Sequence, residues 1–180
     1  MTKEEESDYI KFKEGNISLV LDSYDDIFST FDPRLYSSRA LSDDFITECK
    51  RATFDKGDEI ELRLLVPKDK RSYMEEVKIK KRLKEHFLKH SKEKEKEIKK
   101  LKLIGIRWFF LGFLIMGLQV ILLRYGKGLI LDFLSIILTP AGWFFFWEGL
   151  GKIFIDSKSI KSDHDFYRKM SKAEVYFFEY

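Results

Sequence analysis

Two long apolar runs dominate the pattern of hydrophobic and polar positions along the chain. Residues 103–123 carry one charge, Arg107, and residues 129–147 carry one acid, Asp132. A helix of about twenty residues rises about 30 Å, which matches the hydrocarbon core of a bilayer. The linker, residues 124–128, permits only a tight reversal. The pattern predicts a two-helix transmembrane hairpin, and the length of the first run without a polar stripe disfavours a buried core helix of a soluble protein.

The charges around the two runs predict which side of the membrane each end occupies. Twelve lysines and arginines lie between Lys78 and Lys102, six lie between Lys152 and Lys172, and the linker has two. Because basic residues accumulate on the cytoplasmic side, both termini are expected in the cytoplasm and the linker outside. The single cysteine, Cys49, suits a reducing cytoplasm. The expected location is the cell membrane, crossed twice.

The segment before the hairpin predicts one small cytoplasmic α+β domain. This domain comprises residues 1–100, and its last part is a long basic helix. Short β-prone runs at residues 9–12 and 17–21 surround the turn sequence Glu14-Gly15-Asn16 and predict a β-hairpin.

A helix and a strand follow in the same domain. Ser42 is a suitable N-cap for a helix over residues 43–54. Within residues 59–66, the apolar positions Ile60, Leu62, Leu64 and Val66 alternate with Glu61 and Arg63, and Pro67 closes the run. This alternation predicts a strand with one buried face.

From Ser72 the pattern becomes helical. The apolar side chains expected to face the sheet are Tyr73, Val77, Ile79, Leu83, Phe87 and Leu88. Residues 92–100 are charged on all sides, and no helix breaker separates them from the first apolar run. One continuous helix into the membrane is therefore expected.

The segment after the second run, residues 150–180, is expected to be a cytoplasmic tail that returns to the domain. Residues 150–155 are expected to lie along the membrane interface, and Ser162 can cap a short helix through Met170. Residues 173–180 are β-prone and rich in aromatic side chains, so they predict a strand that pairs with the N-terminal sheet. The predicted fold class is α+β: a small cytoplasmic sheet with flanking helices, interrupted by a two-helix transmembrane hairpin.

Acidic and basic side chains gather in the first quarter of the chain. Asp32 precedes a proline, which disfavours helix and predicts a turn. Asp25, Asp26 and Asp32 can lie near Arg34 and Arg39. The group is interpreted either as an active site or ligand pocket, or as caps and turns held by ion pairs, and the structural interpretation is favoured. Asp32, Arg34 and Arg39 are the candidate site residues.

Other motifs that carry chemistry are weak. His86 and His90 are four residues apart and share a helix face, but zinc needs more ligands than two histidines. Asp163-His164-Asp165 is more readily interpreted as a helix start. Neither a phosphate-binding glycine loop nor a Ser-His-Asp or Cys-His arrangement is apparent. The sequence therefore predicts no metal and no cofactor, and it disfavours an enzyme without excluding one.

Basic side chains beside the apolar runs predict contact with anionic lipid headgroups. The residues expected to make this contact are Lys99, Lys100, Lys102, Arg107 and Lys152. Nucleic-acid binding is less favoured, because interleaved glutamates dilute the positive field that phosphate binding needs. The expected partners are therefore the lipid bilayer, with a cytoplasmic protein and a second copy of the chain as further candidates.

The sequence resembles a family of uncharacterised prokaryotic two-span membrane proteins. The stretch Asp26-Ile27-Phe28-Ser29-Thr30-Phe31-Asp32-Pro33-Arg34, followed by Arg39-Ala40-Leu41-Ser42-Asp43-Asp44-Phe45, carries this likeness. The resemblance implies an Asp-Pro turn after the first strand, a βαβ cytoplasmic part, two close spans and a short tail. It implies no activity and no catalytic residues.

Three functions are compatible with the sequence. The favoured one is a membrane-anchored interaction or sensing module. The others are a small membrane-associated enzyme that uses the region of Asp32, Arg34 and Arg39, and a membrane-perturbing effector that the cytoplasmic domain restrains.

Overall fold

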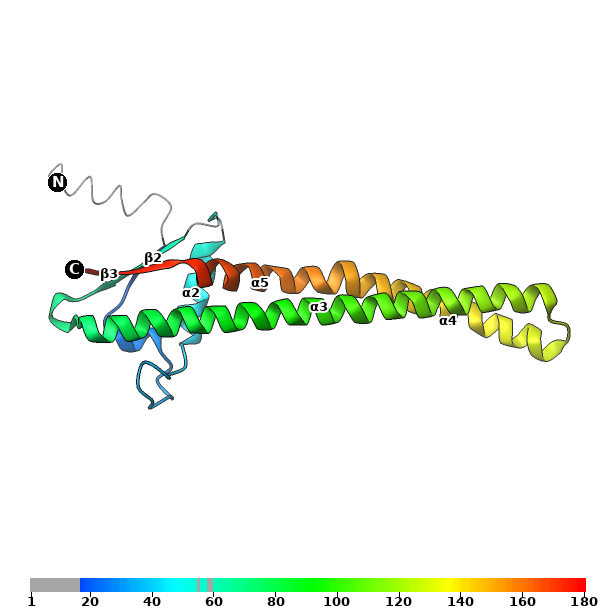
Figure 1. Cartoon of the computed structure of the whole chain (residues 1–180), viewed down its shortest axis with the longest axis horizontal. Helices are drawn as coiled ribbons and strands as arrows, with labels where there is room; N and C mark the ends of the chain where they lie inside the picture. The colour runs from blue at the N-terminus through cyan, green and yellow to red at the C-terminus, as the bar shows by residue number, and fades with distance from the viewer. Residues whose placement is uncertain (1–16, 55, 58–59) are drawn as a thin grey trace. The chain divides into compact units, whose positions relative to one another are not determined.

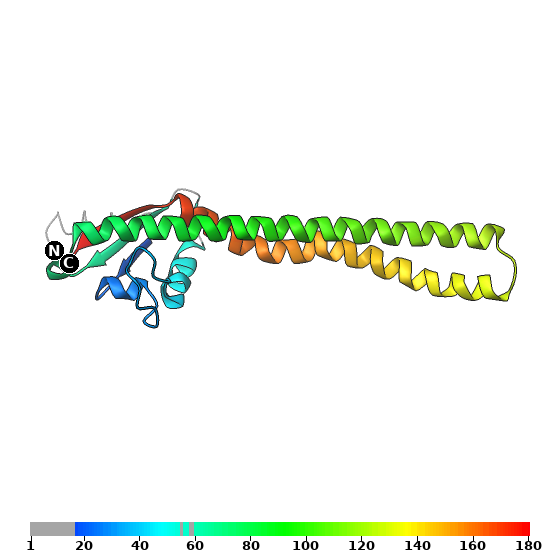
Figure 2. The same cartoon turned by 60° about the horizontal axis from the view of Figure 1, so that its bottom comes forward.

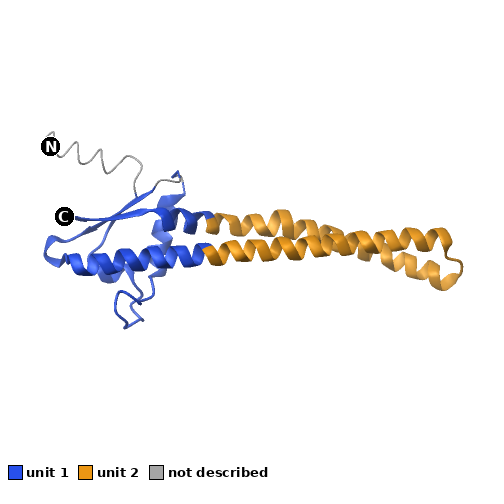
Figure 3. Ribbon diagram, viewed as in Figure 1, with its two compact units in different colours: residues 1–91, 165–180 blue, residues 92–164 orange. Residues whose placement is uncertain are grey.

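The computed structural model describes residues 17–54, 56–57 and 60–180. The elements in chain order are β1 (Ile17–Val20), η1 (Tyr24–Ile27), α2 (Asp43–Thr53), β2 (Glu61–Val66), η2 (Lys68–Lys70), α3 (Tyr73–Tyr125), α4 (Leu129–Gly151), η3 (Lys152–Asp156), α5 (Ser157–Lys172) and β3 (Glu174–Glu179), as Figure 1 shows. They form two compact units, coloured in Figure 3. Unit 1 extends to Ser91 and includes Asp165–Tyr180, and unit 2 is Lys92–His164. The α+β fold class is confirmed.

The sheet of unit 1 has three parallel strands in the order β1-β2-β3. In the central strand, Leu64 lies opposite Leu19 of β1 and Phe177 of β3. Because β3 follows both apolar helices in the chain, the helical hairpin is an insertion between two adjacent strands of one sheet. The expected return of the C-terminal strand is therefore confirmed. Residues 9–12, the expected hairpin partner of β1, lie outside the described residues.

One face of the sheet carries the core of unit 1. Leu62 and Leu64 of β2 are buried, as the alternating pattern predicts. The register places Ile17 and Phe177 on the same face, and both are buried there. The opposite face leaves apolar side chains such as Val20 exposed. Within the described part of the chain, the sheet therefore has one packed face and one open face.

The helix expected at residues 43–54 is α2, and it covers part of the core. Phe45, Cys49 and Thr53 follow the helical spacing of four residues, and all three are buried. Ser42 occupies the N-cap position as expected, although its side chain makes no capping hydrogen bond.

The long helix α3 is continuous, as the lack of a breaker predicts. It runs along the sheet in Figure 2, and Ile79, Leu83 and Phe87 are buried against the core. The face of α3 that was predicted to be buried is, however, wider than the face that is buried in the structure. The side chains that are exposed instead are Tyr73, Val77 and Leu88. A sheet covers only a narrow stripe of a helix, so apolar side chains to either side of that stripe stay in solvent.

The tail corrects one expectation. Residues 150–155 are helical, because α4 leads directly into η3, a π-helical segment. The last helix begins at Ser157, so Ser162 lies inside it and does not cap it. Because the residues before Ser162 are already helical, no unpaired backbone N–H groups are left there for a cap to satisfy.

The two apolar runs form the helices of unit 2. Both helices are long and apolar enough to cross a membrane, and only 6% and 11% of their most apolar stretches are buried. The exposed side chains include Leu114, Val120, Ile130, Phe133 and Ile136. A core helix of a soluble protein would bury such side chains, so the buried-core alternative does not describe these helices.

Four glycines allow the two helices of unit 2 to pack closely. Gly105 and Gly112 of α3 face Gly149 and Gly142 of α4 in antiparallel order. A Cβ atom at Gly112 would lie 2.8 Å from the carbonyl oxygen of Gly142, and one at Gly149 would lie 2.7 Å from that of Gly105. In contrast, a Cβ at Gly117 would meet nothing within 4 Å. The close approach therefore depends on particular glycines and not on glycine content in general.

A polar contact accompanies the glycines. The side-chain amide of Gln119 on α3 donates to Oγ1 of Thr139 on α4, at 2.5 Å. Thr139 in turn donates to the carbonyl of Ser135, at 3.0 Å. In apolar surroundings an interhelical hydrogen bond such as that between Gln119 and Thr139 contributes about 1 kcal/mol to helix association.

Candidate functional site

The candidate site residues lie in a long loop of unit 1, residues 29–40, called the 29–40 loop below. An antiparallel bridge between Phe28 and Leu41 closes its base. The backbone N–H of Ser29 donates to the carbonyl of Ala40, and that of Ser42 donates to Ile27, both at 2.9 Å. The loop is therefore pinned to the core, since Phe28 and Leu41 are themselves buried.

Asp32 organises the interior of the loop. Its carboxylate accepts hydrogen bonds from the backbone N–H groups of Arg34, at 3.2 Å, and Ala40, at 2.6 Å. It also accepts from Nε and Nη2 of the Arg34 guanidinium, at 2.8 and 2.7 Å. The Arg34 side chain, followed by the Ala40 amide, holds the pKa of Asp32 well below its usual range. Asp32 is thus an ionised anchor of the turn, and its oxygens are already engaged.

Arg39 ties the loop to its surroundings. Its Nε donates to the carbonyl of Ser29, at 3.0 Å, and its Nη1 pairs with the carboxylate of Asp25. Arg82 of α3 donates to the Arg39 carbonyl, at 2.9 Å. Tyr36 also donates to Asp25, at 3.3 Å, and its ring stacks on a core phenylalanine. The expected cluster of acids and arginines therefore forms two separate ion pairs.

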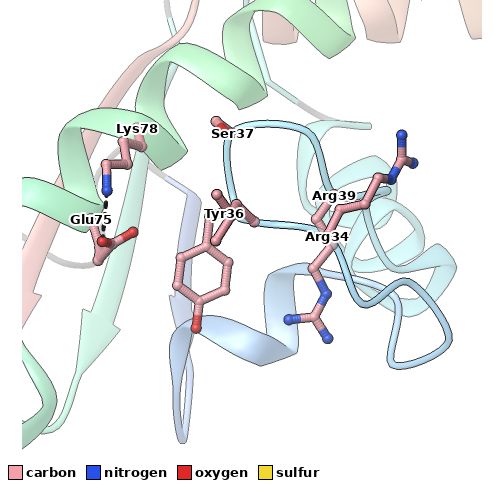
Figure 4. Close-up of a pocket in the computed structure, with 7 residues that line it drawn as sticks. Arg34, Tyr36, Ser37, Arg39, Glu75 and Lys78 are labelled. Atoms are coloured by element: carbon pink, nitrogen blue, oxygen red, sulfur yellow. Dashed lines mark hydrogen bonds and ion pairs between the residues drawn. The ribbon is translucent and has the colours of Figure 1, made fainter.

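A hollow of about 440 Å³ lies between the 29–40 loop and the first turns of α3. Figure 4 shows the Tyr36 ring between the two arginines and the Glu75–Lys78 pair of α3. The ammonium of Lys78 lies 2.8 Å from the Glu75 carboxylate. The residues that line the hollow are Arg34, Leu35, Tyr36, Ser37, Arg39, Glu75 and Lys78. Sequence reasoning identified the arginines but not the two residues of α3, which meet them only in the folded chain.

Replacing Asp32 with alanine is expected to loosen the 29–40 loop without unfolding unit 1. The amide of Ala40 loses a charge-assisted hydrogen bond, so it should exchange with solvent deuterium roughly tenfold faster. Amides of β2 should be unaffected. Because a depressed pKa preserves the bond until the pH falls below the usual aspartate range, the wild-type Ala40 amide should remain protected at pH 4. Hydrogen exchange measured by mass spectrometry tests both points.

Asp44→Ala is the matched control for this variant. Asp44 is an exposed acid on α2 outside the loop, and its replacement should leave exchange at Ala40 unchanged. If Asp32→Ala also leaves that exchange unchanged, Asp32 is not the anchor of the loop.

A buried carboxylate that the sequence analysis missed joins α3 to η1. Glu76 is 4% exposed and accepts from the hydroxyl of Tyr24, at 3.0 Å. Arg71 pairs with both oxygens of Glu76, at 2.9 and 3.1 Å. The backbone of Ser72 donates to the Tyr24 hydroxyl, at 2.9 Å. The only sequence signal was spacing: Glu76 lies three residues before Ile79, on the stripe of α3 that packs against the core.

His86 and His90 share a face of α3, as their spacing predicts, with ring centroids 4.3 Å apart. Burial, followed by the charge of His90, lowers the pKa of His86 to about 4. Tyr167 of α5 packs near both rings. Among the described residues, no group of three or more potential metal ligands comes together. The pair is therefore a half-buried histidine contact packed beside Tyr167 in unit 1.

The basic residues expected at lipid headgroups all lie in unit 2. Lys99, Lys100, Lys102 and Arg107 are exposed on α3. Lys152 pairs with Glu148, at 2.7 Å, and its ammonium lies 5.5 Å from the centroid of Trp108. The structure places these cations along the helices of unit 2.

The fold and the loop define a class of protein in which an α+β unit is interrupted by an apolar helical hairpin. No protein-family model, curated protein or solved structure matches the chain. The resemblance based on residues 26–34 and 39–45 therefore stays an expectation.

Proposed function

We propose that the protein is a membrane-anchored interaction module that crosses the bilayer twice. One observation carries this proposal: the apolar helices expose apolar side chains and are inserted between two paired strands. Because β2 and β3 lie in one sheet, the hairpin must leave and re-enter the same compartment. A hairpin of two bilayer-length helices meets this requirement and satisfies its backbone hydrogen bonds internally.

The charges support an orientation with unit 1 in the cytoplasm. Twelve cations precede the first apolar run within 25 residues and two lie in the turn, which favours an external turn. Lys99, Lys100, Lys102, Arg107 and Lys152 then contact anionic headgroups, at about 1 kcal/mol for each well-placed cation. In this proposal they hold the hairpin at the cytoplasmic surface.

The 29–40 loop supports an interaction role for unit 1. Phe31 and Leu35 are 96% and 81% exposed, although the loop that carries them is pinned by backbone and side-chain hydrogen bonds. Because such a loop is already rigid, it loses little conformational entropy when a partner covers its apolar side chains. The likeness to uncharacterised two-span membrane proteins agrees with this proposal.

Thiol labelling from outside the cell tests the span and its orientation together. Cys49 is fully buried and burial raises its pKa to about 12, so the natural thiol should not react in the folded protein. Cysteines are introduced separately at Lys127, in the turn, and at Asp69, in η2. A membrane-impermeant maleimide should label Lys127→Cys in intact spheroplasts, and it should label Asp69→Cys only after permeabilisation.

The outcomes separate the parts of the proposal. The reverse labelling pattern would overturn the orientation. Labelling of both variants before permeabilisation, together with release of the protein from membranes by alkaline carbonate, would overturn the two-span anchor. The unmodified chain is the control, because label on it would show that Cys49 is accessible.

A further inference from the structure

We propose that the hollow beside the 29–40 loop binds an acidic segment of a partner protein, in which a carboxylate side chain stands next to a large apolar one. The inference rests on the proposed function and names the chemistry of the partner. It depends on three features of the hollow: open hydrogen-bond donors, nearly balanced charge, and the exposed apolar side chain of Leu35 in its lining.

The open donors come from Arg34 and Lys78. The Arg34 side chain is 61% exposed, and Asp32 accepts only from its Nε and Nη2 atoms. No described residue accepts from its Nη1 atom. Glu75 pairs with the ammonium of Lys78, which has three N–H donors in all. Arg39, by contrast, is 14% exposed and committed to Asp25 and the loop backbone.

The balance of charge selects a carboxylate over a phosphate. Each cation of the hollow already has a carboxylate partner, so the ligand is held by directed donors more than by net charge. A ligand with one negative charge meets Arg34 and Lys78 with limited repulsion from Asp32 and Glu75. A phosphate group carries about twice that charge and meets more repulsion from the same carboxylates.

An exposed apolar side chain selects a peptide over a free anion. Leu35 lines the hollow and is 81% exposed on the pinned loop. A partner segment with a leucine-sized or aromatic residue beside its carboxylate would cover this side chain and exclude water from the charged contact.

The test is a random 12-residue peptide library displayed on phage and selected against the full chain in nanodiscs of neutral phosphatidylcholine. Selected peptides should be enriched in Asp or Glu next to Leu, Ile or Phe. Synthetic fluorescein-labelled copies of the selected peptides then measure affinity by polarisation. Arg34→Gln, Lys78→Gln and Leu35→Ser should each weaken binding about tenfold, as expected for loss of one charge-assisted hydrogen bond or one buried leucine.

The matched controls are Arg51→Gln and Phe54→Ser on and beside α2. Arg51 is an exposed arginine paired with Glu48, and Phe54 is an exposed apolar side chain outside the hollow. Both variants should bind within about twofold of the wild type. A charge swap distinguishes direct contact with the peptide from simple loosening of the loop. The Arg34→Glu variant should bind poorly to the acidic peptide. It should regain binding when the acidic residue of the peptide is exchanged for lysine.

Three results would overturn the inference. One is a selection with no acidic-apolar enrichment, and another is equal losses in the hollow and control variants. The third is that the chain binds phosphatidylserine vesicles but no peptide, and that Arg34→Gln abolishes the vesicle binding. The labelling of Lys127→Cys and Asp69→Cys is independent of all three, so failure of peptide binding and failure of the membrane anchor are distinguished.

Discussion

Replacing Phe177 with alanine is expected to lower the free energy of unfolding of unit 1 by about 3–5 kcal/mol, the usual cost of truncating a buried phenylalanine. The ring is 8% exposed and packs edge-on against Tyr24, with centroids 5.7 Å apart. It lies opposite Leu64 in the sheet, which is fully buried. Domains of this size are stable by about 5–15 kcal/mol, so a large part of the margin would be lost.

Cys49 provides the measurement for this variant. A thiol reagent reaches it only when unit 1 opens, because the residue is fully buried in the core. Its labelling across a denaturant titration of the full chain in micelles therefore reports unfolding of unit 1. Tyr176→Ala, on the open face of the same strand, is the control and should cost about 1 kcal/mol or less. Equal losses for the two variants would mean that β3 does not contribute to the core.

Replacing Gly112 with isoleucine is expected to separate the two helices of unit 2. Even the first atom of the new side chain would lie 2.5 Å from the backbone nitrogen of Phe146 and 2.8 Å from the Gly142 carbonyl oxygen. Both contacts are with backbone, which cannot rotate away as a side chain can. The helices must move apart, and the contact between Gln119 and Thr139 is lost with the close packing.

Gly117→Ile is the matched control, because a Cβ there meets nothing within 4 Å. The measurement is tryptophan fluorescence during an SDS titration in micelles, since Trp108 packs against Phe145 across the helix pair, with centroids 5.2 Å apart. Gly112→Ile should shift the transition to lower SDS by the equivalent of about 1–3 kcal/mol, the usual cost of overpacking. Coincident transitions for the two variants would show that the glycine contact does not hold the helices together.

Local patterns in the sequence were sufficient to predict most elements. The apolar runs, the alternation that forms β2 and the helix after Ser42 each follow from neighbouring residues alone. The continuity of α3 follows from a missing breaker. Even the pairing of β3 was predictable. An aromatic strand that is predicted on the same side of the membrane as a small sheet has few ways to cover its side chains other than joining that sheet.

The candidate site was predicted only in part. Asp32 was identified as a turn residue, and its bond to the backbone of Arg34, two residues on, is a short-range consequence of the Asp-Pro sequence. Its bond to the amide of Ala40 joins residues eight apart and depends on the folded loop. The hollow itself was not predictable, because Glu75 and Lys78 lie about forty residues further along the chain and meet the loop only after α3 has packed on the sheet.

By itself, therefore, the sequence determined the two apolar helices, the strand-forming runs, the charges that flank them and the turn at Asp32. The tertiary structure alone decided three things: which stripe of α3 is buried, why Glu76 lies in the core, and which glycines meet across the helix pair. The physical reason is the same in each case. Periodicity specifies a helix and its faces, but burial, close approach and ion-pair geometry depend on the partner surface, and residues distant in the chain supply that surface.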